Sequence, residues 1–203
     1  MIFMPPRHGK SELASKRFPA WCLGRDPKRQ IIAASYNSDL ANDFGRNVRN
    51  LVAEPEFGQV FPNVSLAPDS QAANRMNTNH KGAYVAAGVG TAVTGRGAHI
   101  ALIDDPFKDR EEADSERRRD LVWDWYRSTL YTRLMPGGAI VLIQTRWHED
   151  DLAGRILEQE AGQWEVLELP AINKGGEPLW PEWYNLEALN RIKATIGPRE
   201  WSA

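Results

Sequence analysis

The sequence predicts an α/β protein with a mainly parallel central sheet flanked by helices. Short, continuously apolar runs alternate along the chain with longer segments of helical periodicity, a pattern typical of parallel strands that are covered on both faces. Several of these runs end directly in polar residues. Because ligands bind at the carboxyl ends of the strands in such sheets, these polar residues are the first candidates for a functional site.

The composition supports a folded globular protein of this class. The chain has 203 residues, of which 42% are hydrophobic and 26% are charged. Its net charge of −2 excludes a strongly basic protein that coats nucleic acid, although a local basic patch is still compatible with it. A single cysteine, Cys22, excludes a framework of intrachain disulfides. No apolar run approaches the ~20 residues that span a bilayer, so we expect no contact with a membrane.

Apolar runs of strand length mark the expected strands. The first run, at residues 1–4, is very short and enters the turn Gly9-Lys10-Ser11. The runs 100–103 and 139–143 are apolar throughout. The expected strands cover residues 1–4, 30–36, 83–87, 100–103, 139–143 and 165–169.

Longer segments with helical periodicity connect these strands. The expected helices cover residues 12–22, 39–52, 111–134 and 150–160. Gly24 is the expected stop of the first helix. Residues 54–80 are rich in Pro, Asn and Ser and predict mostly loop, and the glycine-rich residues 88–97 predict a turn into the next strand.

Gly9-Lys10-Ser11 matches the second half of the usual phosphate-loop pattern, while Met4 stands at the position of the first glycine. In such loops, backbone N–H groups at a helix N-terminus hold phosphate oxygens, the lysine reaches the β- and γ-phosphates, and the serine binds Mg²⁺. Taken alone, the same residues also fit an ordinary strand–loop–helix turn. The candidate nucleotide-binding residues are Pro6, Arg7, His8, Gly9, Lys10, Ser11 and Glu12.

Asp104 and Asp105 follow the apolar run 100–103, as the acidic residues of a Walker B strand do. Asp104 is the expected Mg²⁺ ligand together with Ser11, and Asp105 is the expected general base for the attacking water. An acidic turn after a strand is common, but it does not explain a Gly-Lys-Ser turn after another apolar run. The two clusters together predict a site for ATP and Mg²⁺ that hydrolyses ATP.

Gln144 and Thr145 follow the run 139–143. In ATPases with a strand added between the two Walker strands, a polar residue at the tip of that strand senses the γ-phosphate. Either Gln144 or Thr145 suits this role, and capping of the next helix is the alternative. A cation also assists phosphoryl transfer, and an arginine of the chain can supply it. A solvated or structural arginine is the alternative for each of the three candidates, which are Arg7, Arg96 and Arg146.

The chain resembles the large terminase subunit of tailed bacteriophages, the motor that packages DNA. Matching motifs follow one another in order over nearly the whole chain. They are PPRHGKS at residues 5–11, ASYN at 34–37, GRG at 95–97 leading to IDDP at 103–106, TRWHEDDL at 145–152, LWPE at 179–182 and GPREW at 197–201.

This resemblance implies a P-loop NTPase fold of the additional-strand, RecA-like class. It implies an ATPase domain over residues 1–170, with 171–203 as a linker or the start of a following domain. It further implies ATP-driven translocation of double-stranded DNA into a procapsid, with the portal protein and the small terminase subunit as partners. A homo-oligomeric ring in the bacterial cytoplasm is expected. Nuclease activity is expected only from a downstream domain outside this chain. We therefore expect this chain to be a piece of a longer protein.

Two other functions remain compatible with the residues. A helicase-like ATPase that remodels nucleic acid would share the same nucleotide site. A switch module that binds ATP without hydrolysing it is the second alternative, because Asp105 stands where many ATPases of this type have glutamate, which is one methylene longer.

Overall fold

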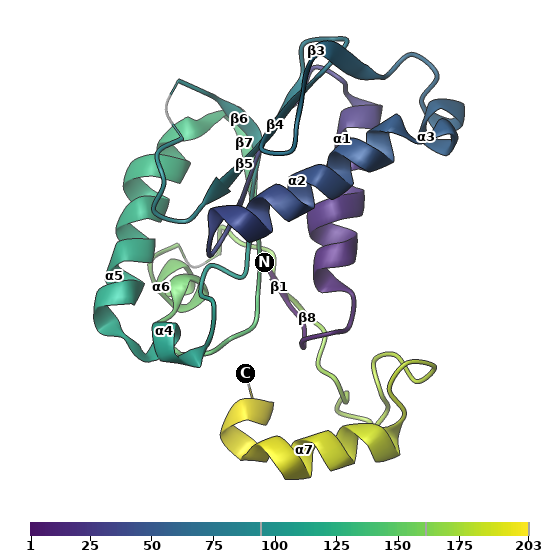
Figure 1. Ribbon diagram of the computed structural model, residues 1–203. Helices are drawn as coiled ribbons and strands as arrows, with labels where there is room; N and C mark the ends of the chain where they lie inside the picture. The colour runs from purple at the N-terminus through teal and green to yellow at the C-terminus, as the bar shows by residue number, and fades with distance from the viewer. Residues whose placement is uncertain (94, 161, 203) are drawn as a thin grey trace.

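The computed structural model describes residues 1–93, 95–160 and 162–202 and shows an eight-stranded sheet flanked by helices (Figure 1). In sheet order, the strands are β3 (Leu66–Ala72), β4 (Arg75–Thr78), β5 (Ala83–Gly88), β2 (Gln30–Ser35), β6 (Ala98–Asp104), β7 (Leu134–Gln144), β1 (Ile2–Phe3) and β8 (Leu167–Glu168). Neighbours from β5 to β8 pair in parallel, whereas β3 and β4 are antiparallel. The predicted mainly parallel sheet is confirmed.

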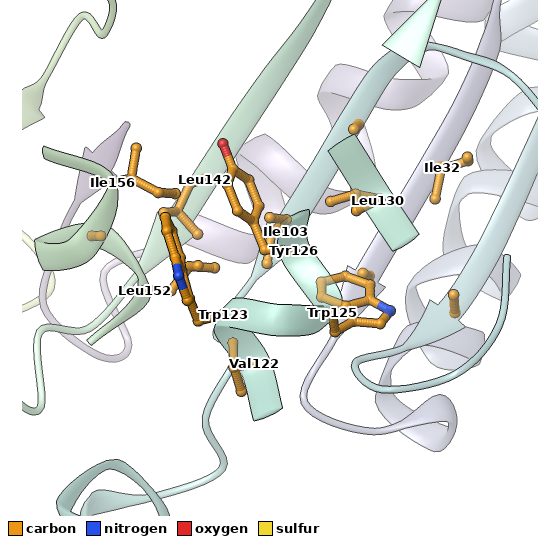
Figure 2. Packing of buried hydrophobic residues seen from close by; sticks show 14 of the residues in the cluster. Ile32, Ile103, Val122, Trp123, Trp125, Tyr126, Leu130, Leu142, Leu152 and Ile156 are labelled. Atoms are coloured by element: carbon orange, nitrogen blue, oxygen red, sulfur yellow. The ribbon is translucent and has the colours of Figure 1, made fainter. Parts of the chain in front are cut away.

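Alternate residues of the central strands lie in two separate hydrophobic clusters, one on each face of the sheet. In β2, Ile31 and Ala33 belong to one cluster, while Ile32 and Ala34 belong to the other. Figure 2 shows the second cluster, in which Ile32 and other strand residues pack against aromatic side chains such as Trp125. Burial on both faces is why these strands are apolar throughout instead of alternating.

The helices of the first half of the chain begin after β1 and β2. A π-helical turn, η1 (Glu12–Arg17), continues directly into α1 (Phe18–Arg25), and Asn37 caps α2 (Ser38–Ala53) by accepting from the N–H of Leu40. The expected stop at Gly24 is wrong, because α1 ends one residue later. An added Cβ at Gly24 would lie 2.4 Å from ring carbons of Phe61, so glycine serves close packing at this position.

The expectation of mostly loop over residues 54–80 is also wrong. This segment contains α3 (Pro55–Val60) and the hairpin of β3 and β4, which extends the sheet beyond β5. Only Met76 and Thr78 are buried in these two strands, and β3 has no fully buried residue. A polar strand at the edge of a sheet carries no apolar period, which is why the pattern did not predict it.

The single helix expected over residues 111–134 is wrong. The segment divides into α4 (Arg110–Asp114), α5 (Glu116–Trp125), η2 (Tyr126–Leu130) and η3 (Tyr131–Arg133). The break falls at Ser115, whose side chain caps α5 by accepting from the N–H of Arg118. After η3 the chain enters β7 at once, so this strand begins several residues before the expected one.

A network of ion pairs joins α5 to the segment that leads into α6 (Leu152–Gln159). Arg119, only 8% exposed, donates to Asp150 at 2.9 Å and to the carbonyls of Ala113 and Asp114. Arg155 donates to both carboxylate oxygens of Asp150, at 2.7 and 2.8 Å. The network therefore fixes the chain just beyond the end of β7.

The last helix, α7 (Leu186–Trp201), lies across the same end of the sheet as the turn from β1 into η1 (Figure 1). It bends at Gly197, whose φ is 82°. Near its end, Arg199 pairs with Asp114 at 2.8 Å, and Arg110 donates to the Arg199 carbonyl. In the described part of the chain, none of the helices has the length and apolar character that crossing a bilayer requires.

The network around Asp150 yields a prediction for stability. Hydrogen bonds from Arg155 and Arg119 lower the pKa of Asp150 to about 2. This carboxylate therefore stabilises the fold above its unfolded-state pKa of about 4, and its contribution is lost as the pH falls through about 2. We expect Asp150→Asn to lower the free energy of unfolding at pH 7 by about 1 kcal/mol, after allowance for solvent screening of the partly exposed carboxylate.

Urea denaturation at several pH values measures this effect, and Asp43→Asn is the matched control. Asp43 forms an exposed pair with Arg46 at 2.6 Å, so its loss is expected to change stability by less than about 0.5 kcal/mol. The difference between Asp150→Asn and the wild type should shrink between pH 4 and 2. A difference that is constant over this range would contradict the ionic origin of the stabilisation.

Candidate nucleotide-binding site

The carboxyl ends of β6, β7 and β1 lie side by side, because β7 pairs in parallel with both of its neighbours. Ile143 of β7 is in register with Asp104 of β6 on one side and Ile2 of β1 on the other. β7 is therefore the strand added between the strand that enters the phosphate loop and the strand that ends in two aspartates, as predicted. The three polar clusters of the sequence therefore meet at this edge, namely Gly9-Lys10-Ser11, Asp104 with Asp105, and Gln144 with Thr145.

The backbone at this edge adopts the left-handed conformation at three positions. Gly9 has a φ of 88°, Arg7 a φ of 63° and Asp105 a φ of 44°. Glycine adopts such angles freely, whereas they are uncommon and strained for other residues and concentrate at functional sites. The Gly9 carbonyl then accepts from the N–H of Leu13 at 3.0 Å, which starts the helical segment after the loop.

Lys10 joins all three clusters. Its ammonium, on a residue only 8% exposed, donates to Asp105 Oδ1 at 2.8 Å and to Thr145 Oγ1 at 2.6 Å. The same oxygen of Asp105 accepts from the backbone N–H of Thr145 at 2.9 Å. A largely buried charge needs such partners, and here they come from the ends of β6 and β7.

Asp104 lies deeper than Asp105 and is 1% exposed. One of its oxygens, Oδ2, accepts a hydrogen bond from Ser15 Oγ, and Ser15 itself is fully buried. Burial raises the pKa of Asp104, and the charge of Asp105 raises it further; the Ser15 and Ser11 hydroxyls and the Lys10 ammonium act in the opposite direction. Sequence reasoning missed Ser15, although it lies one helical turn after Ser11 and so on the same helix face.

The residues around Asp104 fit a hard divalent cation. Within the described residues, its Oδ1 atom is buried without a hydrogen-bond partner, and the Ser11 hydroxyl lies nearby. Carboxylate and hydroxyl oxygens are ligands that Mg²⁺ accepts, usually together with phosphate oxygens and water. The left-handed turn at Gly9 and the Lys10 ammonium beside it fit the phosphate groups that would supply the other ligands.

Of the two candidates at the tip of β7, only Thr145 contacts Lys10. Gln144 is 1% exposed, and neither polar atom of its amide makes a hydrogen bond of acceptable geometry to the described residues. Glu12, a candidate phosphate-binding residue, instead pairs with Lys16 and Arg17 on its own helix, at 2.8 and 3.0 Å. At Glu12 the backbone N–H at the start of η1 is therefore the remaining candidate for binding phosphate.

The candidate arginines Arg7 and Arg96 lie in different surroundings. Arg7 and Pro6 are exposed on the phosphate loop itself. Arg96 lines a cavity of about 240 Å³ beyond the end of β5, together with Ser38, Asn42 and others, and none of its lining residues belongs to the three clusters. The structure thus places Arg7, but not Arg96, within the same loop as Lys10.

Residues near the start of α7 cover the phosphate loop. The ring of His8, which is 5% exposed, stacks on Tyr184 with ring centroids 5.0 Å apart, and its Nδ1 lies 2.9 Å from the Pro6 carbonyl oxygen. An added Cβ at Gly9 would lie 3.9 Å from the Trp180 ring. Sequence reasoning missed these contacts, and no local pattern signals them, because they join segments at opposite ends of the chain.

A larger cavity of about 420 Å³ contains Arg146, the third candidate arginine, but none of the other candidate residues. It is lined by Arg110, Arg146, Trp147, His148, Glu149, Arg199 and Ser202. Arg110 lies over the Trp147 ring, and Arg146 pairs with Asp151, the N-cap of α6, at 2.8 Å. Arg146 therefore has a structural partner.

Comparisons with known proteins agree with this fold. The family model of the terminase large subunit, T4-like-virus type, N-terminal, matches residues 1–196. Among solved structures, the crystal structure of the HK97 bacteriophage large terminase is similar, with a TM-score of 0.55 and 14% sequence identity. The match covers 85% of this chain and 36% of that one, and at this identity it shows the fold alone. No curated protein matches the chain. The model for the N-terminal part of these subunits thus matches nearly the whole length of this chain. The chain belongs to the family of T4-like-virus-type terminase large subunits.

Proposed function

We propose that this chain binds ATP with Mg²⁺ and hydrolyses it to drive the translocation of double-stranded DNA. The observation that carries the proposal is the contact of Lys10 with both Asp105 and Thr145, because it joins the phosphate loop to the ends of β6 and β7. Fold and family membership support the packaging context.

Each residue of the site would have a separate role. The backbone from His8 to Glu12 and the Lys10 ammonium would hold the phosphates, and Ser11 and Asp104 would hold Mg²⁺. The bound cation would neutralise charge on the β- and γ-phosphates. Asp104 needs no large movement to serve as a ligand, because Ser15 holds one of its oxygens and leaves the other free.

Asp105 and Lys10 change partners when phosphates arrive. In the present structure, the ammonium of Lys10 neutralises Asp105 at 2.8 Å. Phosphate oxygens would offer this ammonium a more highly charged partner, so the Asp105 carboxylate would be released to accept a proton from the attacking water. Thr145 is hydrogen-bonded to both Lys10 and Asp105, and we assign it, with Gln144 beside it in the sequence, to sensing of the γ-phosphate.

Family membership supports a proposal for the larger assembly. We propose double-stranded DNA, the portal protein and the small terminase subunit as partners, in a homo-oligomeric ring in the bacterial cytoplasm. Arg7 or Arg96 would act on the developing charge, within a subunit or on a neighbour. We also propose that residues 1–170 form the ATPase domain and that 171–203 lead towards a nuclease domain.

Lys10→Ala tests the phosphate site. Loss of the ammonium removes a charge-assisted hydrogen bond to phosphate, so we expect the affinity for Mg·ATP to fall roughly 10- to 100-fold and turnover to disappear. Isothermal titration calorimetry measures the affinity. Lys16→Ala is the matched control, because Lys16 belongs to the same helical segment but pairs with Glu12. Equal affinity of Lys10→Ala and the control would contradict the assignment.

Asp105→Asn separates hydrolysis from binding. The amide cannot accept the proton from water, so we expect turnover to fall roughly 100-fold or more while Mg·ATP still binds as tightly as to the wild type. Phosphate release in the presence of double-stranded DNA measures turnover. If the wild type itself binds ATP without turnover, even as the full-length protein, the non-hydrolysing switch is favoured. Stimulation by single strands but not by duplex would favour a helicase-like enzyme.

Ser15→Ala tests the positioning of Asp104. Without the hydroxyl, the carboxylate is free to rotate, so we expect the Mg²⁺ concentration for half-maximal ATP binding to rise roughly 10-fold. Binding of ATP in the presence of a chelator should not change, whereas a merely structural defect would weaken both. Titration of Mg²⁺ at fixed ATP makes the measurement, and an unchanged Mg²⁺ dependence would contradict the role.

A further inference from the structure

Three aromatic residues before α7, Trp180, Trp183 and Tyr184, form an aromatic platform beside the phosphate loop. The rings of Trp180 and Trp183 stack with centroids 5.7 Å apart and an interplanar angle of 26°. Tyr184 meets the edge of Trp183 and stacks on His8 of the phosphate loop. The platform is thus attached to the loop through His8 and lies next to Gly9.

The local backbone holds this platform in shape. The N–H groups of Trp183 and Tyr184 both donate to the Trp180 carbonyl, at 3.1 and 2.9 Å. Asn185 then caps α7 by accepting from the N–H of Ala188 at 2.9 Å. A tight turn followed by a capped helix fixes the relative positions of the three rings before any ligand arrives.

The two indoles of the platform are incompletely covered. Trp180 is 42% exposed and Trp183 is 61% exposed, although burial of such large apolar rings is strongly favourable. The adjoining His8 is buried, yet its Nε2 atom has no hydrogen-bond partner among the described residues. The exposed faces of the indoles are suited to stacking with a planar heterocycle. The Nε2 atom of His8 beside them is suited to a hydrogen bond with the same heterocycle.

We propose that the indoles of Trp180 and Trp183 form the stacking subsite for the purine base of the bound nucleotide. This inference rests on the proposed function, since phosphates held at Gly9 to Ser11 would bring the base within reach of the Trp180 ring, which lies beside Gly9. Stacking on an aromatic side chain contributes to affinity for any base, because every base has a π face. The bound nucleotide would thereby contact the segment that leads into α7.

Calorimetry with two ligands on the whole chain tests the proposal. Mg·ATP carries a base, whereas Mg·tripolyphosphate offers the phosphates alone. We expect Trp183→Ala to lower the affinity for Mg·ATP about tenfold and to leave the affinity for tripolyphosphate unchanged. Trp183→Phe, which keeps a flat ring, should recover most of the loss. Trp21→Ala is the matched control, because Trp21 is 52% exposed on α1.

The other outcomes overturn the proposal in different ways. Equal losses for both ligands would mean that the platform supports the phosphate loop instead of the base. No loss for either would place the base elsewhere. A loss in binding of a single-stranded oligonucleotide, with ATP binding intact, would assign the indoles to nucleic acid. If the wild type binds neither tripolyphosphate nor ATP, the proposed function itself is refuted, together with this subsite.

Discussion

The contact of the Lys10 ammonium with Asp105 Oδ1 and Thr145 Oγ1 is the interaction on which the site depends. It exists because β7 is inserted between β1 and β6, so that the phosphate loop and the acidic pair face one another across a single strand. The apolar core on both faces of the sheet fixes the strands, and the backbone is left-handed at Gly9 and Asp105, in the segments that follow β1 and β6.

The two adjacent aspartates differ because their surroundings differ. Asp104 is buried, its pKa is raised, and Ser15 holds only one of its oxygens. Asp105 is more exposed and has an ammonium ion within hydrogen-bonding distance. A buried carboxylate with an unsatisfied oxygen is costly unless a cation joins it, whereas a carboxylate with a displaceable partner is ready to accept a proton. Under the proposed function, metal binding and proton transfer would thus fall to two neighbouring residues.

Much of this arrangement was predictable from the sequence, because apolar runs that end in Gly-Lys-Ser, Asp-Asp and Gln-Thr mark strand ends directly. The hairpin at residues 66–78 was not predictable, since edge strands with exposed polar faces have no apolar period. The helix break at Ser115 depends on a side-chain cap within a strongly charged segment. Contacts of Tyr184 with His8 join distant segments, and only the folded chain brings them together. The domain boundary after residue 170 and the roles of individual site residues stay predictions.

A crystal structure of the chain with Mg²⁺ and a non-hydrolysable ATP analogue would show directly whether the residues around Lys10 form the nucleotide site. We expect the phosphates on the backbone of Gly9 to Ser11, with the Lys10 ammonium moved from Asp105 to a phosphate oxygen and the cation between Ser11 and Asp104. This expectation would be contradicted by an analogue bound elsewhere, for instance in the cavity lined by Arg110, Arg146 and Arg199, with the contact between Lys10 and Asp105 unchanged.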